Sequence, residues 1–91
     1  MKKDITIDAL WQLLIDHQNT TFYTLKKLPF HYTVKGGELF VDRRSKSITR
    51  ATFEQALNKL EADLGSITGP KSLNVFGAPY VWALLKAFDS V

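Results

Sequence analysis

A Gly36-Gly37 pair lies between two short runs in which apolar and polar residues alternate, and this feature constrains the fold most. Alternation with a period of two is typical of a strand with one buried face. Two glycines can both adopt positive φ, which a two-residue type I′ turn requires. The sequence therefore predicts a β-hairpin over residues 30–42, with a buried face made by Phe30, Tyr32, Val34, Leu39 and Val41.

A two-residue turn also determines which residues face one another across the hairpin. The predicted pairs are Lys35 with Glu38, Val34 with Leu39, Tyr32 with Val41 and Phe30 with Arg43. On the polar face, His31 is expected beside Asp42. A slip by one residue would expose the whole apolar set to water, so the register is expected to be well defined.

The segment 43–50 that follows the hairpin is basic, with four cations, three hydroxyl side chains and no acid. Thr49 is expected to cap a helix that starts there, because its hydroxyl can accept a hydrogen bond from a free amide of the first turn. Helix N-termini favour anions, and cations and hydroxyls are side chains that contact nucleic-acid phosphates. The segment thus indicates phosphate or other anion binding, and a solvated loop is the simpler alternative.

The candidate nucleic-acid-binding residues are Arg43, Arg44, Lys46, Ser47, Thr49 and Arg50, together with Lys26 and Lys27. The two lysines precede the hairpin, and they would lie near Arg43 if Phe30 pairs with it. Such a surface would hold the phosphate backbone, and no cofactor is expected.

The rest of the chain predicts helices on both sides of the hairpin. Apolar residues recur at helical spacing over 7–15, 53–64 and 81–88. Residues 20–25 are rich in β-prone types and predict a short third strand. The predicted fold class is α+β in one domain spanning 1–91: an N-terminal helix, a small antiparallel sheet and two C-terminal helices. This content is similar to that of winged-helix modules, although the order of elements differs from theirs.

The composition is that of an ordinary globular chain, with 91 residues, 45% hydrophobic content and a net charge of +3. The absence of cysteine excludes disulfides and thiolate metal sites, and it fits a reducing cytoplasm. No apolar run approaches the roughly 18 residues that a membrane-spanning helix needs. The first residues lack the apolar core of a signal peptide. A cytoplasmic protein without a membrane contact is expected.

No motif predicts catalysis. His31 beside Asp42 could be an oriented general base, but a polar cross-strand pair is the simpler interpretation, because no nucleophile or third partner is evident. The two histidines and the scattered carboxylates lack metal-ligand spacing. The stretch 69–72 lacks the glycine spacing of a phosphate loop. We therefore expect a non-enzymatic binding module without a metal.

The last helix offers a second kind of contact surface. Trp82 and Lys86 lie off its apolar stripe. If Trp82 is exposed, this face marks a site for a protein partner or for self-association, whereas burial in the core is the simpler interpretation. A protein-interaction domain, a small phage-type inhibitor or a homodimerisation domain is thus the alternative to nucleic-acid binding.

Two stretches resemble a group of short uncharacterised bacterial and phage-associated proteins. The first is Leu-Pro-Phe-x-Tyr-x-Val-Lys-Gly-x-Glu-Leu-Phe-Val-x-Arg-x-x-Lys-Ser-Ile-Thr-Arg over 28–50, and the second is Thr-Gly-Pro-Lys-x-Leu-x-Val-Phe-Gly over 68–77. The group has no established activity, so the resemblance implies no catalytic or binding residue. It implies a prokaryotic cytoplasmic protein, for example one encoded on a mobile element. The position of Lys27 is often glycine in that group, which leaves the geometry of this turn open.

Overall fold

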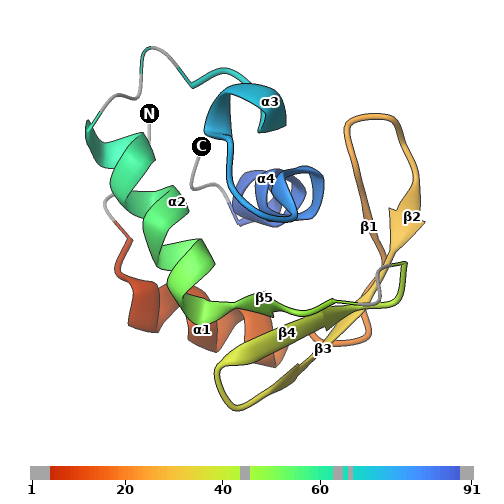
Figure 1. Ribbon diagram of the computed structural model, residues 1–91. Helices are drawn as coiled ribbons and strands as arrows, with labels where there is room; N and C mark the ends of the chain where they lie inside the picture. Colours follow the sequence, from red (N-terminus) through yellow and green to blue (C-terminus); the bar gives the residue numbers. More distant parts are fainter. Residues whose placement is uncertain (1–4, 44–45, 63–64, 66, 89–91) are drawn as a thin grey trace.

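The computed structural model describes residues 5–43, 46–62, 65 and 67–88 (Figure 1). The elements follow in the order α1 (Ile7–Asp16), β1 (Phe22–Tyr23), β2 (Pro29–Phe30), β3 (Tyr32–Lys35), β4 (Glu38–Val41), β5 (Ile48–Thr49), α2 (Arg50–Ala62), α3 (Pro70–Leu73) and α4 (Ala78–Ala87). This order confirms the predicted α+β class. None of the helices in the described ranges has the length and apolar character needed to cross a bilayer.

The predicted hairpin forms two strands of a three-stranded sheet of order β3-β4-β5, in which β4 is central. Its register is the predicted one from Tyr32 opposite Val41 to Lys35 opposite Glu38. At the turn only Gly36 has a positive φ, 59°. Positive φ at the first central residue alone is the requirement of a type II′ turn, so the predicted type I′ turn is wrong.

The strand β5 was not predicted, because it lies within the basic segment that the sequence suggested is a loop. It pairs with β4 through two residues, Thr49 opposite Glu38 and Ile48 opposite Leu39. Ile48 is fully buried. A two-residue strand carries too little periodicity to be recognised, and its formation depends on the tertiary contact of Ile48 with the core.

The predicted third strand over 20–25 forms, but it is shorter and pairs elsewhere. Only Phe22–Tyr23 is extended as β1, and it pairs with β2 in a separate two-stranded sheet. Phe30 therefore faces Phe22, and the predicted pair of Phe30 with Arg43 is wrong. The β3–β4 ladder stops short of this point because the amide of His31 donates to a carboxylate oxygen of Asp42 at 3.0 Å.

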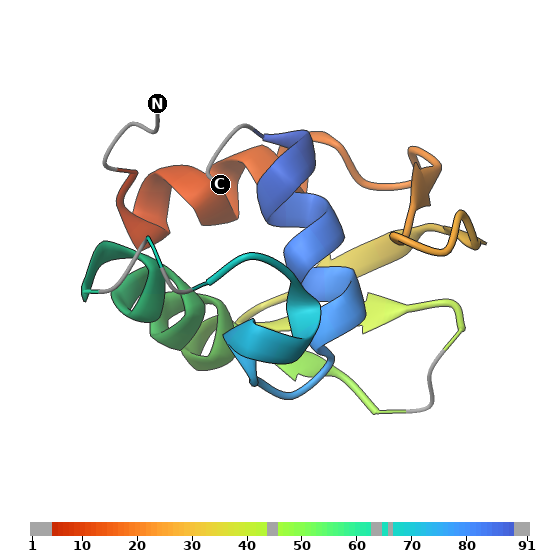
Figure 2. The same cartoon turned by 90° about the horizontal axis from the view of Figure 1, so that it is seen from above.

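The hairpin β1–β2 stands at the end of the molecule away from α2 (Figures 1 and 2). Its inner face packs on α4 through aromatic rings. Phe30 meets Tyr80 with ring centroids 5.0 Å apart, and Phe22 meets Phe88 at 5.9 Å. These contacts fix the position of the hairpin relative to the rest of the domain.

Local capping explains where the helices begin. The Thr49 Oγ1 accepts from the Thr52 amide at 3.2 Å, which confirms the predicted cap of α2. The Thr6 Oγ1 accepts from the Ala9 amide at 3.1 Å at the start of α1. A proline occupies the first turn of α4, as the sequence predicts. The single turn α3 was not predicted.

One hydrophobic cluster joins the helices to the sheet. Its fully buried large side chains are Tyr32, Phe30, Phe53, Leu10, Leu14, Leu39, Ile48, Leu73, Leu84, Leu85 and Val81. Burial of Tyr32 raises the pKa of its hydroxyl well above the ordinary value of a tyrosine. Ile15 is an exception in the stripe over 7–15, because it is exposed.

The β3–β4 turn ties two helices to the sheet. The carbonyl of Gly36 accepts from the indole Nε1 of Trp11 on α1 at 3.2 Å. The carbonyl of Gly37 accepts from the amide of Arg50, the first residue of α2, at 2.8 Å. The start of α2 is thereby held against the hairpin turn.

Candidate functional site

Arg50, one of the cations of the predicted basic surface, already has a partner within the chain. Arg50 forms an ion pair with Asp8 on α1, and its guanidinium lies 6.0 Å from the ring centroid of Trp11. Because Asp8 matches its charge, Arg50 offers less to an external phosphate than the sequence suggested.

The hydroxyl groups of the same segment also have structural contacts. Ser47 donates to Oε1 of Glu38 on β4 at 2.6 Å. Thr49 caps α2. The structure therefore does not place Arg50, Ser47 and Thr49 together as free groups, and Arg44 lies outside the described residues.

The remaining cations of the prediction lie nearer the hairpin β1–β2. An Nη1 of Arg43 donates to the carbonyl of Pro29, the first residue of β2, at 3.4 Å. Lys26 and Lys27 are exposed at the tip between the two strands. Lys46, which follows Arg43 in the chain, is also exposed. Arg43 thus contacts the first residue of β2, next to the tip that carries the two lysines.

The tip of this hairpin is held by Thr24, whose side chain is buried. Its carbonyl accepts from the Lys27 amide at 2.8 Å, and its amide donates to the Leu28 carbonyl at 3.1 Å. Its Oγ1 accepts from the Leu28 amide at 3.2 Å. Lys27 completes the turn with a φ of 65°. These hydrogen bonds therefore hold the backbone of the tip, and with it the positions from which its side chains project.

The hairpin β1–β2 exposes several apolar side chains. Tyr23, Leu25 and Leu28 are 61%, 58% and 42% exposed. Pro29 lies directly opposite Tyr23 and is also exposed. Monomeric proteins seldom gather large apolar side chains on one exposed element without a use for them.

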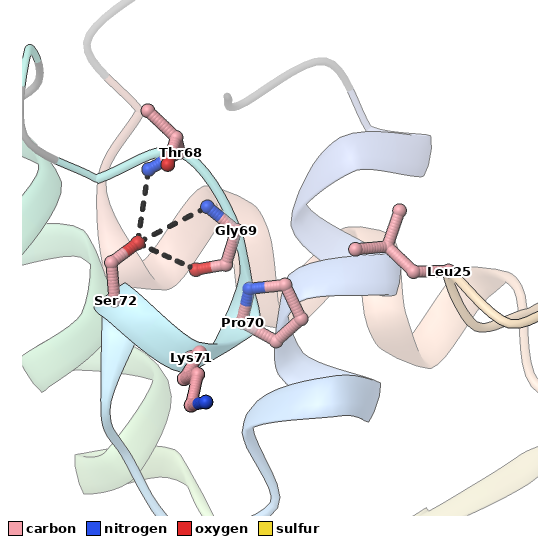
Figure 3. A pocket seen from close by; sticks show the side chains of 6 residues that line it. All are labelled: Leu25, Thr68, Gly69, Pro70, Lys71 and Ser72. Carbon is pink, nitrogen blue, oxygen red and sulfur yellow. Dashed lines mark hydrogen bonds between the residues drawn. The ribbon is translucent and has the colours of Figure 1, made fainter.

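A groove separates the hairpin tip from α3 (Figure 3). It is lined by Leu25, Thr68, Gly69, Pro70, Lys71 and Ser72, and it has a volume of about 470 Å³.

The Ser72 hydroxyl pairs with three backbone groups of the groove. Oγ of Ser72 accepts from the amides of Thr68 at 3.0 Å and Gly69 at 3.2 Å, and it donates to the Gly69 carbonyl at 3.0 Å (Figure 3). These atoms therefore leave little hydrogen-bonding capacity for a ligand.

Charge is distributed unevenly over the chain. No Asp or Glu occurs in residues 17–37, which contain the hairpin β1–β2, or in residues 64–88, which contain α3 and α4. The lysines of these stretches are Lys26, Lys27, Lys35, Lys71 and Lys86. The two walls of the groove thus come from acid-free parts of the sequence.

The His31–Asp42 pair lies at the surface. His31 Nδ1 is 3.3 Å from Asp42 Oδ2, and the side chains are 51% and 40% exposed. Neither residue lines the groove described above. Within the described residues, no group of three or more His, Cys, Asp or Glu side chains could hold a metal ion.

The predicted contact surface on the last helix is not formed as proposed. Trp82 is only 6% exposed and belongs to the core, whereas Lys86 is exposed. The last helix, α4, contacts α3 on one side and the hairpin β1–β2 on the other, and is therefore buried on both sides. An interface centred on Trp82 would require it at the surface, so that condition is not met and the simpler interpretation, burial in the core, is confirmed.

No known protein family, curated protein or solved structure gives a significant match to this chain. The resemblance to short bacterial and phage-associated proteins therefore stays a prediction. The function has to be argued from the geometry of the chain itself.

The sequence analysis missed Tyr23, Leu25 and Leu28 as surface residues. Two signals could have indicated them. A two-stranded hairpin can bury only one of its faces, and the surrounding stretch contains lysines without acids.

Proposed function

We propose that this chain is a non-enzymatic protein-binding module of the cytoplasm, and that its contact surface is made by the exposed apolar side chains of the hairpin β1–β2. One observation carries the proposal. Of the six exposed large apolar side chains in the described part of the chain, three lie on this hairpin: Tyr23, Leu25 and Leu28.

Two features make this surface suitable for binding. Covering exposed apolar area contributes about 25 cal/mol per Å². The hydrogen bonds of Thr24 hold the tip before any partner arrives, so that little conformational entropy is lost on binding.

Photocrosslinking in cells that naturally produce the chain tests the proposal. Leu28 and Phe40 are matched positions, because they are 42% and 40% exposed and only Leu28 lies on the hairpin. p-Benzoylphenylalanine is introduced at one position or the other. We expect a protease-sensitive adduct with a second protein from position 28, absent from position 40.

The expected adduct should disappear when Tyr23→Ser and Leu25→Ser are added. No adduct from position 28, or the same adducts from both positions, would overturn the proposal. An adduct of two copies of this chain would assign the surface to self-association instead.

Nucleic-acid binding is the second candidate, and it is favoured by the cations of the same hairpin. Lys26 and Lys27 lie at its tip within the acid-free stretch 17–37, and Arg43, which follows Asp42, is hydrogen-bonded to Pro29. Cations of this kind contact phosphates without reading sequence.

Fluorescence anisotropy with labelled single-stranded and duplex DNA tests this candidate. Binding should weaken steeply as salt is added. The variant Lys26→Gln with Lys27→Gln should weaken both complexes, whereas Lys35→Gln, whose residue pairs with Glu38 in the other hairpin, should not. A nuclease-sensitive adduct from position 28 would favour this candidate over the first, and absence of binding at low salt would end it.

A further inference from the structure

We infer that the groove between Leu25 and α3 receives an apolar side chain of a partner protein, in a segment that carries carboxylates on either side of it. The inference rests on the proposed function and names the chemistry of the partner.

The centre of the groove selects an apolar group. Leu25 on the hairpin tip and Pro70 at the start of α3 provide its apolar surface (Figure 3). The amides of Thr68 and Gly69 are satisfied by Ser72. A polar group placed there would lose hydrogen bonds to water with few in exchange, which costs free energy.

A nucleotide base fits this groove less well than an apolar side chain does. Proteins bind unpaired bases by stacking them on aromatic rings or by hydrogen bonds to their edges. None of the six lining residues is aromatic, and the amides of Thr68 and Gly69 are already paired with the Ser72 hydroxyl.

The rim selects negative charge. Lys71 lines the groove, and Lys26 and Lys27 follow Leu25 directly. No ion pair joins these three lysines to a described carboxylate, and the stretches that carry them contain no acid. Carboxylates of a partner would approach these lysines without displacing an internal partner, and salt would screen the attraction.

Both walls are fixed before binding. The hairpin tip is held by Thr24. On the other side, Nζ of Lys59 on α2 donates to the carbonyls of Leu73 at 3.2 Å and Asn74 at 3.0 Å, which holds the end of α3. A site with two fixed walls can discriminate by shape as well as by charge.

Fluorescein-labelled peptides test the inference. The probe has one Leu or Phe flanked on each side by Asp and Glu. One control peptide has Ser in place of the apolar residue, and another has Asn and Gln in place of the acids. Amide shifts in the NMR spectrum of the protein locate the contact, and fluorescence polarisation measures the affinity.

We expect the probe to shift the amides of Leu25 and of residues 68–72, and each control peptide to bind at least tenfold more weakly. Leu25→Ser should reduce affinity about tenfold, because an apolar contact of this size is lost, and Lys71→Glu should reduce it further. The matched variants Phe40→Ser and Lys35→Glu change an exposed apolar residue and an exposed lysine outside the groove. They should bind as the unmodified chain does.

Absence of shifts at millimolar probe, or shifts that map outside the groove, would overturn the inference. Equal binding of the probe and both control peptides would also overturn it. The photocrosslinking result is independent of the peptides. An adduct from position 28 without peptide binding would leave the proposed function standing and remove only this description of the partner.

Discussion

The hydroxyl of Tyr32 on β3 donates to the carbonyl of Leu14 in α1 at 2.7 Å, and both side chains are buried. Leu14 lies in the last turn of α1, where carbonyl groups have no partner within the helix. Tyr32 therefore completes the hydrogen bonding of α1 from the sheet. This contact joins residues 18 positions apart in the sequence, and it fixes the angle at which the helix crosses the strands.

Tyr32→Phe should lower the free energy of unfolding by about 1–3 kcal/mol, because the Leu14 carbonyl is left buried without a donor. Urea denaturation followed by circular dichroism measures the change. Tyr23→Phe is the matched control, since Tyr23 is exposed, and it should change stability little. Equal effects of the two variants would contradict a structural role for the Tyr32 hydroxyl.

The same tyrosine should make stability fall in alkali. Burial raises the pKa of Tyr32 in the folded state, whereas an unfolded tyrosine ionises near pH 10. Above that pH the unfolded state loses its proton first, so stability falls by up to about 1.4 kcal/mol per pH unit until folded Tyr32 ionises too. The difference between the unmodified chain and Tyr32→Phe, measured from pH 8 to 11, isolates this contribution. A difference that does not shrink above pH 10 would be contrary to it.

Gly77→Ala should destabilise the domain by about 2 kcal/mol or more, through left-handed backbone strain and overpacking. Gly77 has a φ of 69°, and an added Cβ would lie 2.6 Å from Cδ1 of Ile48. Gly37→Ala is the control, because nothing lies within 4 Å of its added Cβ and its φ is not positive. Thermal unfolding of the two variants tests this, and a similar melting temperature for both would contradict the close approach of Gly77 to Ile48.

Lys27→Gly should stabilise the domain by roughly 0.5–1 kcal/mol. Lysine in the left-handed region is strained, and glycine removes this strain at some cost in unfolded-state entropy. Lys26→Gly lacks the first benefit, because Lys26 is not among the residues with positive φ, and it should not stabilise. Chemical denaturation of both variants decides the matter, and a loss of stability in Lys27→Gly would count against the turn geometry.

The Asp8–Arg50 ion pair should contribute less than about 1 kcal/mol, because Asp8 is 84% exposed and water screens the pair. A double-mutant cycle with Asp8→Asn and Arg50→Gln measures the coupling free energy. The coupling should weaken in high salt. A salt-independent coupling of several kcal/mol would mean that the pair is shielded from solvent more than its exposure indicates.

The sequence alone predicted the local elements correctly where a short-range pattern is complete. The Gly36-Gly37 turn and the alternating residues around it specify the β3–β4 register. Thr49 specifies the start of α2 because capping is a contact between residues three apart. The basic composition of 43–50 was also evident from the sequence. The residues that pair with its charges were not.

Only the tertiary structure decided which side chains of these elements contact one another. Asp8, which is 42 residues away in the sequence, pairs with Arg50. Glu38 on β4 accepts the hydrogen bond of Ser47. Phe30 pairs with Phe22 rather than Arg43, and Trp82 is buried because the hairpin β1–β2 and α3 cover α4. Pattern and propensity describe neighbours along the chain, whereas burial and charge pairing depend on which distant segments meet. That is why the sequence determined the hairpin and the helices, and the packing determined which surface was left exposed.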